Sequence, residues 1–221
     1  MICEMNNSKI IARLSFIAAL LILSMFVVTL ITGVSQEKFE VTQTVESYTR
    51  NLLEANYVLR LYFTIDLIFI CIFTTLFVIL PQYLKTGEKV SDAIANLAIG
   101  AMLLCGFLDF YEDLHILTML DSAVKNIPIE QSQIVSQMLF SMIKFCASYL
   151  SLFLLAFLLP NKTFAEKILK YSLWFFQLPI GILVYTAPES LHLLLNLVRF
   201  VFMVSGFFLL AYIFRKNAET K

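Results

Sequence analysis

Long apolar segments alternate with short polar ones along the whole chain. Six apolar segments are about 20 residues long or more, the length that a helix needs to cross a bilayer: about 12–34, 58–80, 94–120, 134–159, 168–187 and 190–214. The pattern predicts an all-α polytopic membrane helical bundle with six transmembrane helices in a single transmembrane domain, residues 1–221. The longest connection, residues 35–57, is predicted as an external loop, and helical spacing in its second half favours a surface helix that runs into the second span.

Composition supports this fold class. Hydrophobic residues make up 60% of the 221 residues and charged residues 14%, and the mean hydropathy is +0.84. Soluble domains have about 45–50% apolar and about 25% charged residues, so this chain has more apolar surface than one core can hide. Membrane lipid is therefore an expected partner. With zero net charge and no phosphate-binding, CxxC or HExxH motif, no nucleic-acid partner and no cofactor are expected.

The distribution of Lys and Arg predicts the orientation. Ten cations fall in the N-terminal tail, the second and fourth connections and the C-terminus, and four fall on the other side. Because cytoplasmic loops carry the excess of Lys and Arg, both termini are predicted to be cytoplasmic. The apolar run 14–34 is longer than the roughly 7–15 residues of a signal-peptide core. An uncleaved first span is therefore expected, and the small residues of "TGVSQ" leave cleavage open as the alternative.

The segment "LDFYEDLHI", residues 108–116, places acids inside the third apolar run. If this span ended before Asp109, its 15 residues would reach only about 22 Å, less than the roughly 30 Å hydrocarbon core. Each carboxylate near a helix centre costs about 2.5–3.5 kcal/mol on insertion scales, and less near the interface. These acids should therefore face protein, water or a cation.

Charged and polar residues of four spans are predicted to meet in the outer half of the membrane, because their depths agree on the predicted topology. Asp109, Glu112 and Asp113 share one helix face, as do His192, Asn196 and Arg199. The predicted pocket residues are Asp66, Asp109, Glu112, Asp113, His115, Lys144, His192, Asn196 and Arg199.

Within this pocket, Asp66, Asp109 and Glu112 are expected to form an anionic core. Lys144 and Arg199 would be their counter-charges, and His192 and Asn196 a hydrogen-bonding rim. Asp113 and His115 are expected to be solvated rim groups. Pairs such as Asp66–Arg199 or Glu112–Lys144 could instead be purely structural, since polar contacts also hold membrane helices together.

The segments "SKIIARLSF" and "NLLEANYVLRLYFTIDLIF" carry a resemblance to a known family. Lys9, Ala12 and Arg13 fit its start, and the second segment matches at Asn51, Ala55, Asn56, Leu59, Arg60, Leu61 and Asp66. The chain thus resembles a family of bacterial six-helix integral membrane proteins of unknown function over about a quarter of its length. The resemblance implies a six-span bacterial inner-membrane protein and no particular activity. The acid-rich "LDFYEDLH" departs from the family's pattern.

Three classes of function fit these observations. The preferred hypothesis is a pocket that binds or translocates a cation, a proton or a small zwitterionic solute, and a transporter of this size would need a homodimer. The alternative is an accessory or sensory membrane protein in which the charge cluster is structural.

The second alternative is a membrane-embedded metal-dependent hydrolase, with ligands from Asp109, Glu112, His115 and His192. A zinc hydrolase needs about three such ligands and an open position. With two histidines in the chain, this alternative is the weakest, no catalytic residue is assigned, and the identity of any metal is left open.

Overall fold

The computed structural model describes residues 2–219, with the side chains of residues 7–184, 186–188, 190–191 and 194–219. The α-helices are α1 (Ile2–Thr32), α2 (Val45–Leu84), α3 (Lys89–Val124), α4 (Gln131–Leu158), α5 (Phe164–Ser172), α6 (Leu178–Thr186) and α7 (His192–Glu219). Three short helices complete the order: η1 (Gln36–Phe39), η2 (Leu173–Gln177) and η3 (Glu189–Leu191). Within the described residues, six helical segments are long and apolar enough to cross a membrane. The predicted all-α, six-helix polytopic fold is therefore confirmed.

Local sequence sets where the helices begin and turn. The Thr44 hydroxyl caps α2 by accepting a hydrogen bond from the Ser47 amide, because the first amides of a helix have no partner inside it. A reciprocal capping box between Thr163 and Glu166 starts α5. Gly87 has a φ of 84° in the turn between α2 and α3, a conformation that glycine adopts without steric cost.

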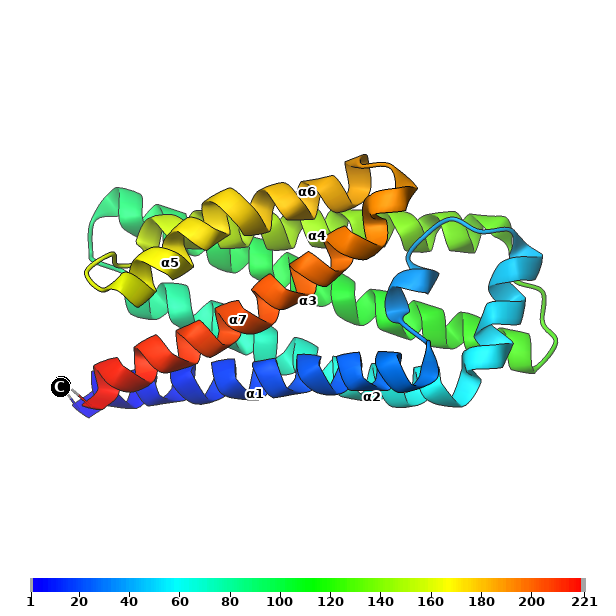
Figure 1. Ribbon diagram of the computed structural model, residues 1–221, viewed down its shortest axis with the longest axis horizontal. Helices are drawn as coiled ribbons and strands as arrows, with labels where there is room; N and C mark the ends of the chain where they lie inside the picture. Colours follow the sequence, from blue (N-terminus) through cyan, green and yellow to red (C-terminus); the bar gives the residue numbers. More distant parts are fainter. Residues whose placement is uncertain (1, 220–221) are drawn as a thin grey trace.

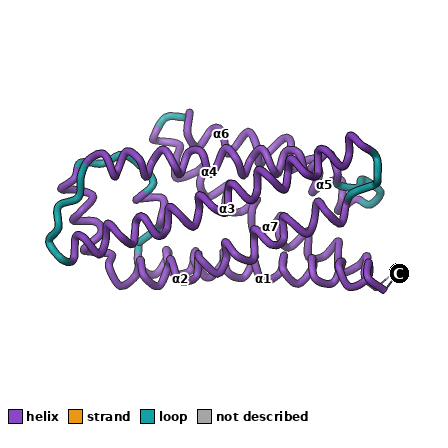
Figure 2. The backbone as a smooth tube through the Cα atoms, turned by 180° about the vertical axis from the view of Figure 1, so that it is seen from behind, coloured by secondary structure: helices purple, strands orange, loops and turns teal. Residues whose placement is uncertain are grey.

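The helices lie along one long axis, and the connections gather at its two ends (Figures 1 and 2). The beginning of α1 and the end of α7 lie together at one end of the bundle (Figure 1), where the Ser8 hydroxyl donates to the Phe214 carbonyl. The turns 85–88 and 159–163 share that end, and the segments 33–44 and 125–130 lie at the other, which we call the η1 end. Which side of a membrane each end faces stays a prediction.

Two helices are longer than a bilayer requires. The 40 residues of α2 and the 36 of α3 would extend to about 60 and 54 Å if straight, against about 30 Å of hydrocarbon. Helix α2 begins inside the segment predicted as a loop. Its first turns run across the η1 end before the helix turns along the bundle (Figure 1). They help to enclose a second apolar core, which includes Phe39, Tyr48 and Met119.

The fifth span is interrupted at its centre. The segment Leu173–Gln177 between α5 and α6 is π-helical and directly precedes Leu178 and Pro179, the first residues of α6. Proline has no amide hydrogen and distorts a regular α-helix, and π segments are one way to absorb such a distortion. The fifth span therefore changes helix type directly before Pro179.

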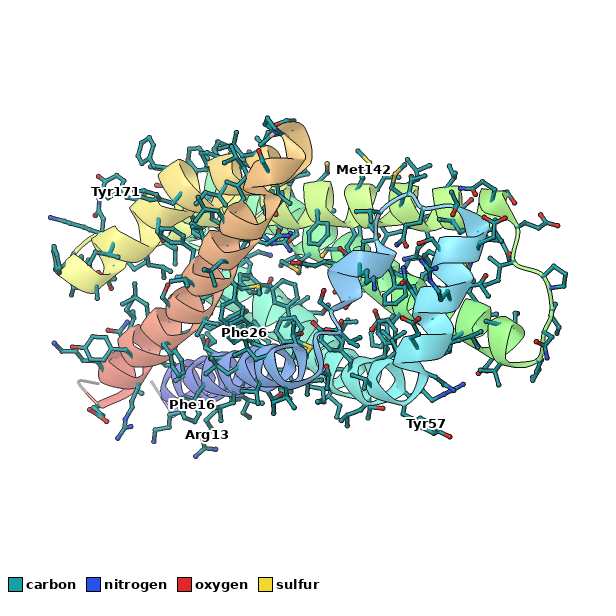
Figure 3. The ribbon with its side chains drawn as sticks, turned by 45° about the vertical axis from the view of Figure 1, so that its right-hand side comes forward. Arg13, Phe16, Phe26, Tyr57, Met142 and Tyr171 are labelled. Atoms are coloured by element: carbon teal, nitrogen blue, oxygen red, sulfur yellow. The ribbon has the colours of Figure 1, made fainter. Side chains whose placement is uncertain are left out.

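The outer surface of the bundle is apolar, as expected for contact with lipid. Phe16, Tyr57, Met142 and Tyr171 point away from the helices (Figure 3), and all four side chains are exposed. The helix faces that point inward carry the buried polar groups, because within hydrocarbon a polar group has no water to bind.

Candidate functional site

Lys144 on α4 is the centre of a buried charge cluster. Its Nζ lies 2.9 Å from Asp109 Oδ1 and 2.9 Å from Glu112 Oε2, both on α3. A third carboxylate oxygen, Glu40 Oε1, lies 3.4 Å away. Lys144 is only 4% exposed. Burying an ammonium group is tolerable because three carboxylates replace its water.

The segment between α1 and α2 supplies residues that the sequence did not predict. Gln36 donates to Glu112 Oε1 at 3.3 Å and to Asp113 Oδ1 at 3.1 Å, and Glu40 reaches Lys144. Gln36 and Phe39 are both buried. The signal in the sequence is weak: Gln36, Phe39 and Glu40 have the i, i+3, i+4 spacing of one helix face, within a segment otherwise typical of an external loop.

Arg199 pairs with the same segment rather than with Asp66. Its Nη2 lies 2.6 Å from Glu37 Oε1, and the Asn196 amide donates to the other Glu37 oxygen at 3.0 Å. Of the two pairs considered from the sequence, Glu112–Lys144 is present and Asp66–Arg199 is wrong. The reason is that η1 folds back into the end of the bundle and brings a closer carboxylate to Arg199.

The remaining predicted residues occupy different environments. Asp113 was expected to be a solvated rim group, and this is wrong: it is 0% exposed, because the η1 segment covers it. His115 is half-buried, and its Nδ1 lies 2.8 Å from Gln137 Oε1, so on α4 it faces Gln137 rather than Lys144. The side chain of His192 lies outside the described residues.

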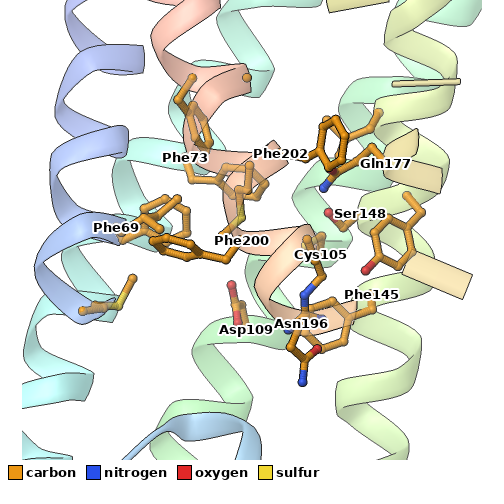
Figure 4. Close-up of a pocket in the computed structure, with 18 of the residues that line it drawn as sticks. Phe69, Phe73, Cys105, Asp109, Phe145, Ser148, Gln177, Asn196, Phe200 and Phe202 are labelled. Atoms are coloured by element: carbon orange, nitrogen blue, oxygen red, sulfur yellow. The ribbon is translucent and has the colours of Figure 1, made fainter. Parts of the chain in front are cut away.

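A cavity of about 420 Å³ opens beside the charge cluster, within the roughly 300–1,000 Å³ range of small-molecule sites. Five predicted residues line it: Asp66, Asp109, Lys144, Asn196 and Arg199. Glu37 and Glu40 line it as well, whereas Glu112, Asp113 and His115 do not. Asp109 and Asn196 lie at one end of the close-up view, with Phe73 and Phe202 farther along the cavity (Figure 4).

Asp66 on α2 differs from the other carboxylates of the cavity. It is 6% exposed and lines the cavity, yet no described residue lies within hydrogen-bonding or ion-pairing distance of its carboxyl group. Because a buried carboxylate without a partner is costly, it must be protonated, hydrated or bound to a cation.

Glu40 lies outside the membrane-spanning segments, and its charge depends on the cluster. Burial opposes ionisation of this carboxyl group. The Lys144 ammonium, a hydrogen bond with Glu112 and the positive charge of Arg199 outweigh that effect and hold the pKa of Glu40 below its ordinary value of 4.5. Glu40 is therefore an anion at neutral pH.

The chain was compared with protein-family models, curated proteins and solved structures. No match was found. No family match therefore supports the resemblance of residues 51–66 to bacterial six-helix membrane proteins. The structure supports only the more general conclusion that the chain has six long apolar helices among its described residues. The interpretation of the cavity consequently depends on its own residues.

The geometry gives little support to a metal centre. Among the described residues, no group of three or more His, Cys, Asp or Glu side chains is placed to hold a metal ion. The Glu112–His115 spacing on α3 does not create such a group, because Glu112 faces Lys144 and His115 faces Gln137. The cluster is better described as a set of ion pairs next to a cavity.

Proposed function

We propose that the cavity is the binding site of a bacterial inner-membrane protein for a cation or for a small solute with an ammonium group. The observation that carries the proposal is Asp66, a buried carboxylate that lines the cavity and has no partner among the residues that the structure describes. A positively charged ligand would supply that partner. The cavity volume is that of a small-molecule site.

The balance of charge around the cavity favours a cation over an anion. Among the described residues, four carboxylates line it, Glu37, Glu40, Asp66 and Asp109, against the two cations Lys144 and Arg199. Both cations already contact carboxylates, Lys144 in the buried cluster and Arg199 at Glu37. An anionic ligand would have to displace these contacts, whereas a cationic one would meet surplus acid.

Within this proposal, the predicted residues take distinct roles. Asp66 binds the positive group, and Asp109 contributes negative charge from the opposite wall. Lys144, Glu112 and Asp113 keep the α3–α4 side of the site in place. Asn196 forms its hydrogen-bonding rim, and Arg199 holds Glu37 in place. His115 supports α4 through Gln137.

The test compares two carboxylate-to-amide variants in lipid nanodiscs of phosphatidylglycerol. Thermal unfolding of wild type, Asp66→Asn and Asp121→Asn is measured from pH 5 to 8 with butylammonium, Na⁺ or Mg²⁺. Asp121 is a matched control because it is half-exposed and paired with Arg60, and it does not line the cavity. We expect at least one cation to raise the Tm of wild type and of Asp121→Asn but not of Asp66→Asn. Equal shifts in all three proteins, or no shift with any cation, would overturn the proposal.

A second candidate is supported by the contacts of Lys144. With three carboxylate partners, this residue joins α3, α4 and the η1 segment as a structural brace would. In an accessory or sensory protein, the η1 end would then be the surface that meets a partner. Retention of full stability in Asp66→Asn, with no response to any cation, would favour this candidate.

A further inference from the structure

The wall of the cavity changes from charged to apolar along both α2 and α7. On α2, Tyr62 and Asp66 are followed by Phe69, Phe73 and Phe77. On α7, Asn196 and Arg199 are followed by Phe200, Met203 and Phe207. Both helices run away from the η1 end. The lining residues of both therefore change from polar to apolar in that same direction (Figure 4).

The apolar part is long enough to hold an alkyl chain. Asp66 and Phe77 are 11 residues apart, as are Arg199 and Leu210, and all four line the cavity. At 1.5 Å per residue, each pair spans about 16 Å along its helix. A small polar solute bound at Asp66 would leave this aromatic and aliphatic chamber unfilled.

Gly206 on α7 lines the chamber without filling it. It lines the cavity, and a Cβ added there would meet no atom within 4 Å. A larger side chain at this position would therefore project into the empty apolar part without first displacing protein. Gly206 thus offers a way to fill the chamber while leaving the charged end intact.

We propose that the ligand is an amphiphile with an ammonium head group and an alkyl tail. The head group binds at Asp66, where the ring of Tyr62 can add a cation–π contact. The tail lies along the cavity face of α2 and α7, against the packed rings of Phe73 and Phe207. This inference rests on the proposed function and adds the class of ligand. The same chemistry is present in membrane aminophospholipids and in free amphiphilic amines.

The experiment measures the affinity of alkylammonium ions of increasing length. Dissociation constants of butyl-, hexyl- and octylammonium are determined for the protein in phosphatidylglycerol nanodiscs, free of detergent, with empty nanodiscs subtracted. Burial of each methylene should tighten Kd about threefold to fourfold, so octylammonium should bind about 100-fold more tightly than butylammonium. This series is measured with the wild-type protein alone and needs no variant.

Two glycine variants locate the tail. In Gly206→Leu, the Kd of octylammonium should be less than about threefold lower than the Kd of butylammonium, and the Kd of butylammonium should be unchanged from wild type. Gly100→Leu is the matched control, since Gly100 lies in α3, also has open space around a Cβ, and does not line the cavity. It should behave as wild type does.

The outcomes separate this inference from the proposed function. If butyl- and octylammonium bind wild type equally, or if Gly206→Leu keeps the full gain, the amphiphile is ruled out and the cation site stands. If none of them binds, the amphiphile is ruled out, and the proposed function fails as well unless Na⁺ or Mg²⁺ raises the Tm of wild type. Nanodiscs that contain phosphatidylethanolamine identify the source: at least a tenfold weaker octylammonium Kd indicates that the aminophospholipid occupies the site, and an unchanged Kd indicates a free amphiphile.

Discussion

Lys144 shows how much one buried charge can contribute to the stability of this protein. Replacing it with the similarly shaped Met would leave three carboxylates close together without a counter-charge. Removing one partner of a buried ion pair typically costs about 3–5 kcal/mol, so Lys144→Met should lower the free energy of unfolding by that amount. Unfolding in nanodiscs, followed by heat or by titration with SDS, measures the change.

Arg60→Met is the comparison for that prediction. Arg60 pairs with Asp121, but their side chains are 44% and 50% exposed, and exposed ion pairs contribute little to stability because water screens them. A second change, Glu112→Gln in the Lys144→Met background, should recover part of the loss because one unpaired charge disappears. If Lys144→Met were no more harmful than Arg60→Met, the charge cluster would not be a determinant of the fold.

Glu40 should make stability depend on acid pH. Its pKa lies below the ordinary 4.5 in the folded protein, so between these two values the unfolded chain binds more protons than the folded one. The contribution of Glu40 is therefore fully present above pH 4.5 and is lost as the pH falls through the lowered pKa. The Tm of wild type should drop over this interval more steeply than that of Glu40→Gln. Parallel curves would show that Glu40 has no lowered pKa.

At this scale, the sequence identified one side of the cluster. The Glu112–Lys144 pair could be anticipated because both residues lie on polar helix faces at matching depth. The pairing of Arg199 with Glu37 instead of Asp66 could not be anticipated. Glu37 lies in a connection, and helix spacing does not define the membrane depth of such a residue. The burial of Asp113 was missed because the segment that covers it, which includes Gln36, also lies in this connection.

The contact between α2 and α3 depends on a glycine. A Cβ on Gly106 would overlap the hydroxyl and methyl groups of Thr74, so the two helices approach closely only because glycine has no side chain. Gly106→Ala should destabilise the protein by about 1–3 kcal/mol, the usual cost of overpacking, and Thr74→Ala should restore much of it. Thermal unfolding of both variants and of the double variant measures this.

Gly100→Ala provides the control on the same helix. A Cβ there meets no atom within 4 Å, and alanine favours a helix over glycine by about 0.5–1 kcal/mol. This variant should be as stable as wild type or slightly more so. If Gly100→Ala and Gly106→Ala were equally destabilised, the close approach of α2 and α3 at Thr74 would be contradicted.

For the helices, hydrophobic periodicity was sufficient to predict their number and approximate position. The helix expected in the second half of segment 35–57 is present as the first turns of α2, which begins at Val45. What periodicity missed is that this end of the helix packs on a second apolar core. It also missed the π-helical segment before α6. That segment depends on how a chain accommodates Pro179, which no hydrophobic pattern records.

For the whole molecule, the untested prediction is its orientation in the membrane. In a variant with all four cysteines replaced by alanine, single cysteines at Lys125, Thr86 or Asn161 would be exposed at the ends of the bundle. The distribution of Lys and Arg predicts that intact cells expose only Lys125→Cys to an impermeant maleimide. Labelling of Thr86→Cys and Asn161→Cys instead would place both termini outside.

The arrangement of the whole bundle was only partly predictable. Six apolar segments implied six helices, and an even number of spans implied termini at the same end, as Figure 1 shows. A pocket was predicted and five of its residues line the cavity, but its volume and its apolar part could not be foreseen, because they depend on how η1 closes the end of the bundle and on the open space beside Gly206. Those are properties of packing between distant segments.

The most direct test of the account is the position of a bound ligand. Crystals of the protein grown in a lipid mesophase would be soaked with octylammonium that carries a terminal bromine, and the bromine located by anomalous scattering. The account predicts one bromine peak in each molecule, in the apolar part of the cavity beside Gly206 and Phe207, with the ammonium group at Asp66. Bromine peaks confined to the lipid-facing surfaces of the helices, with side chains filling the cavity, would contradict it.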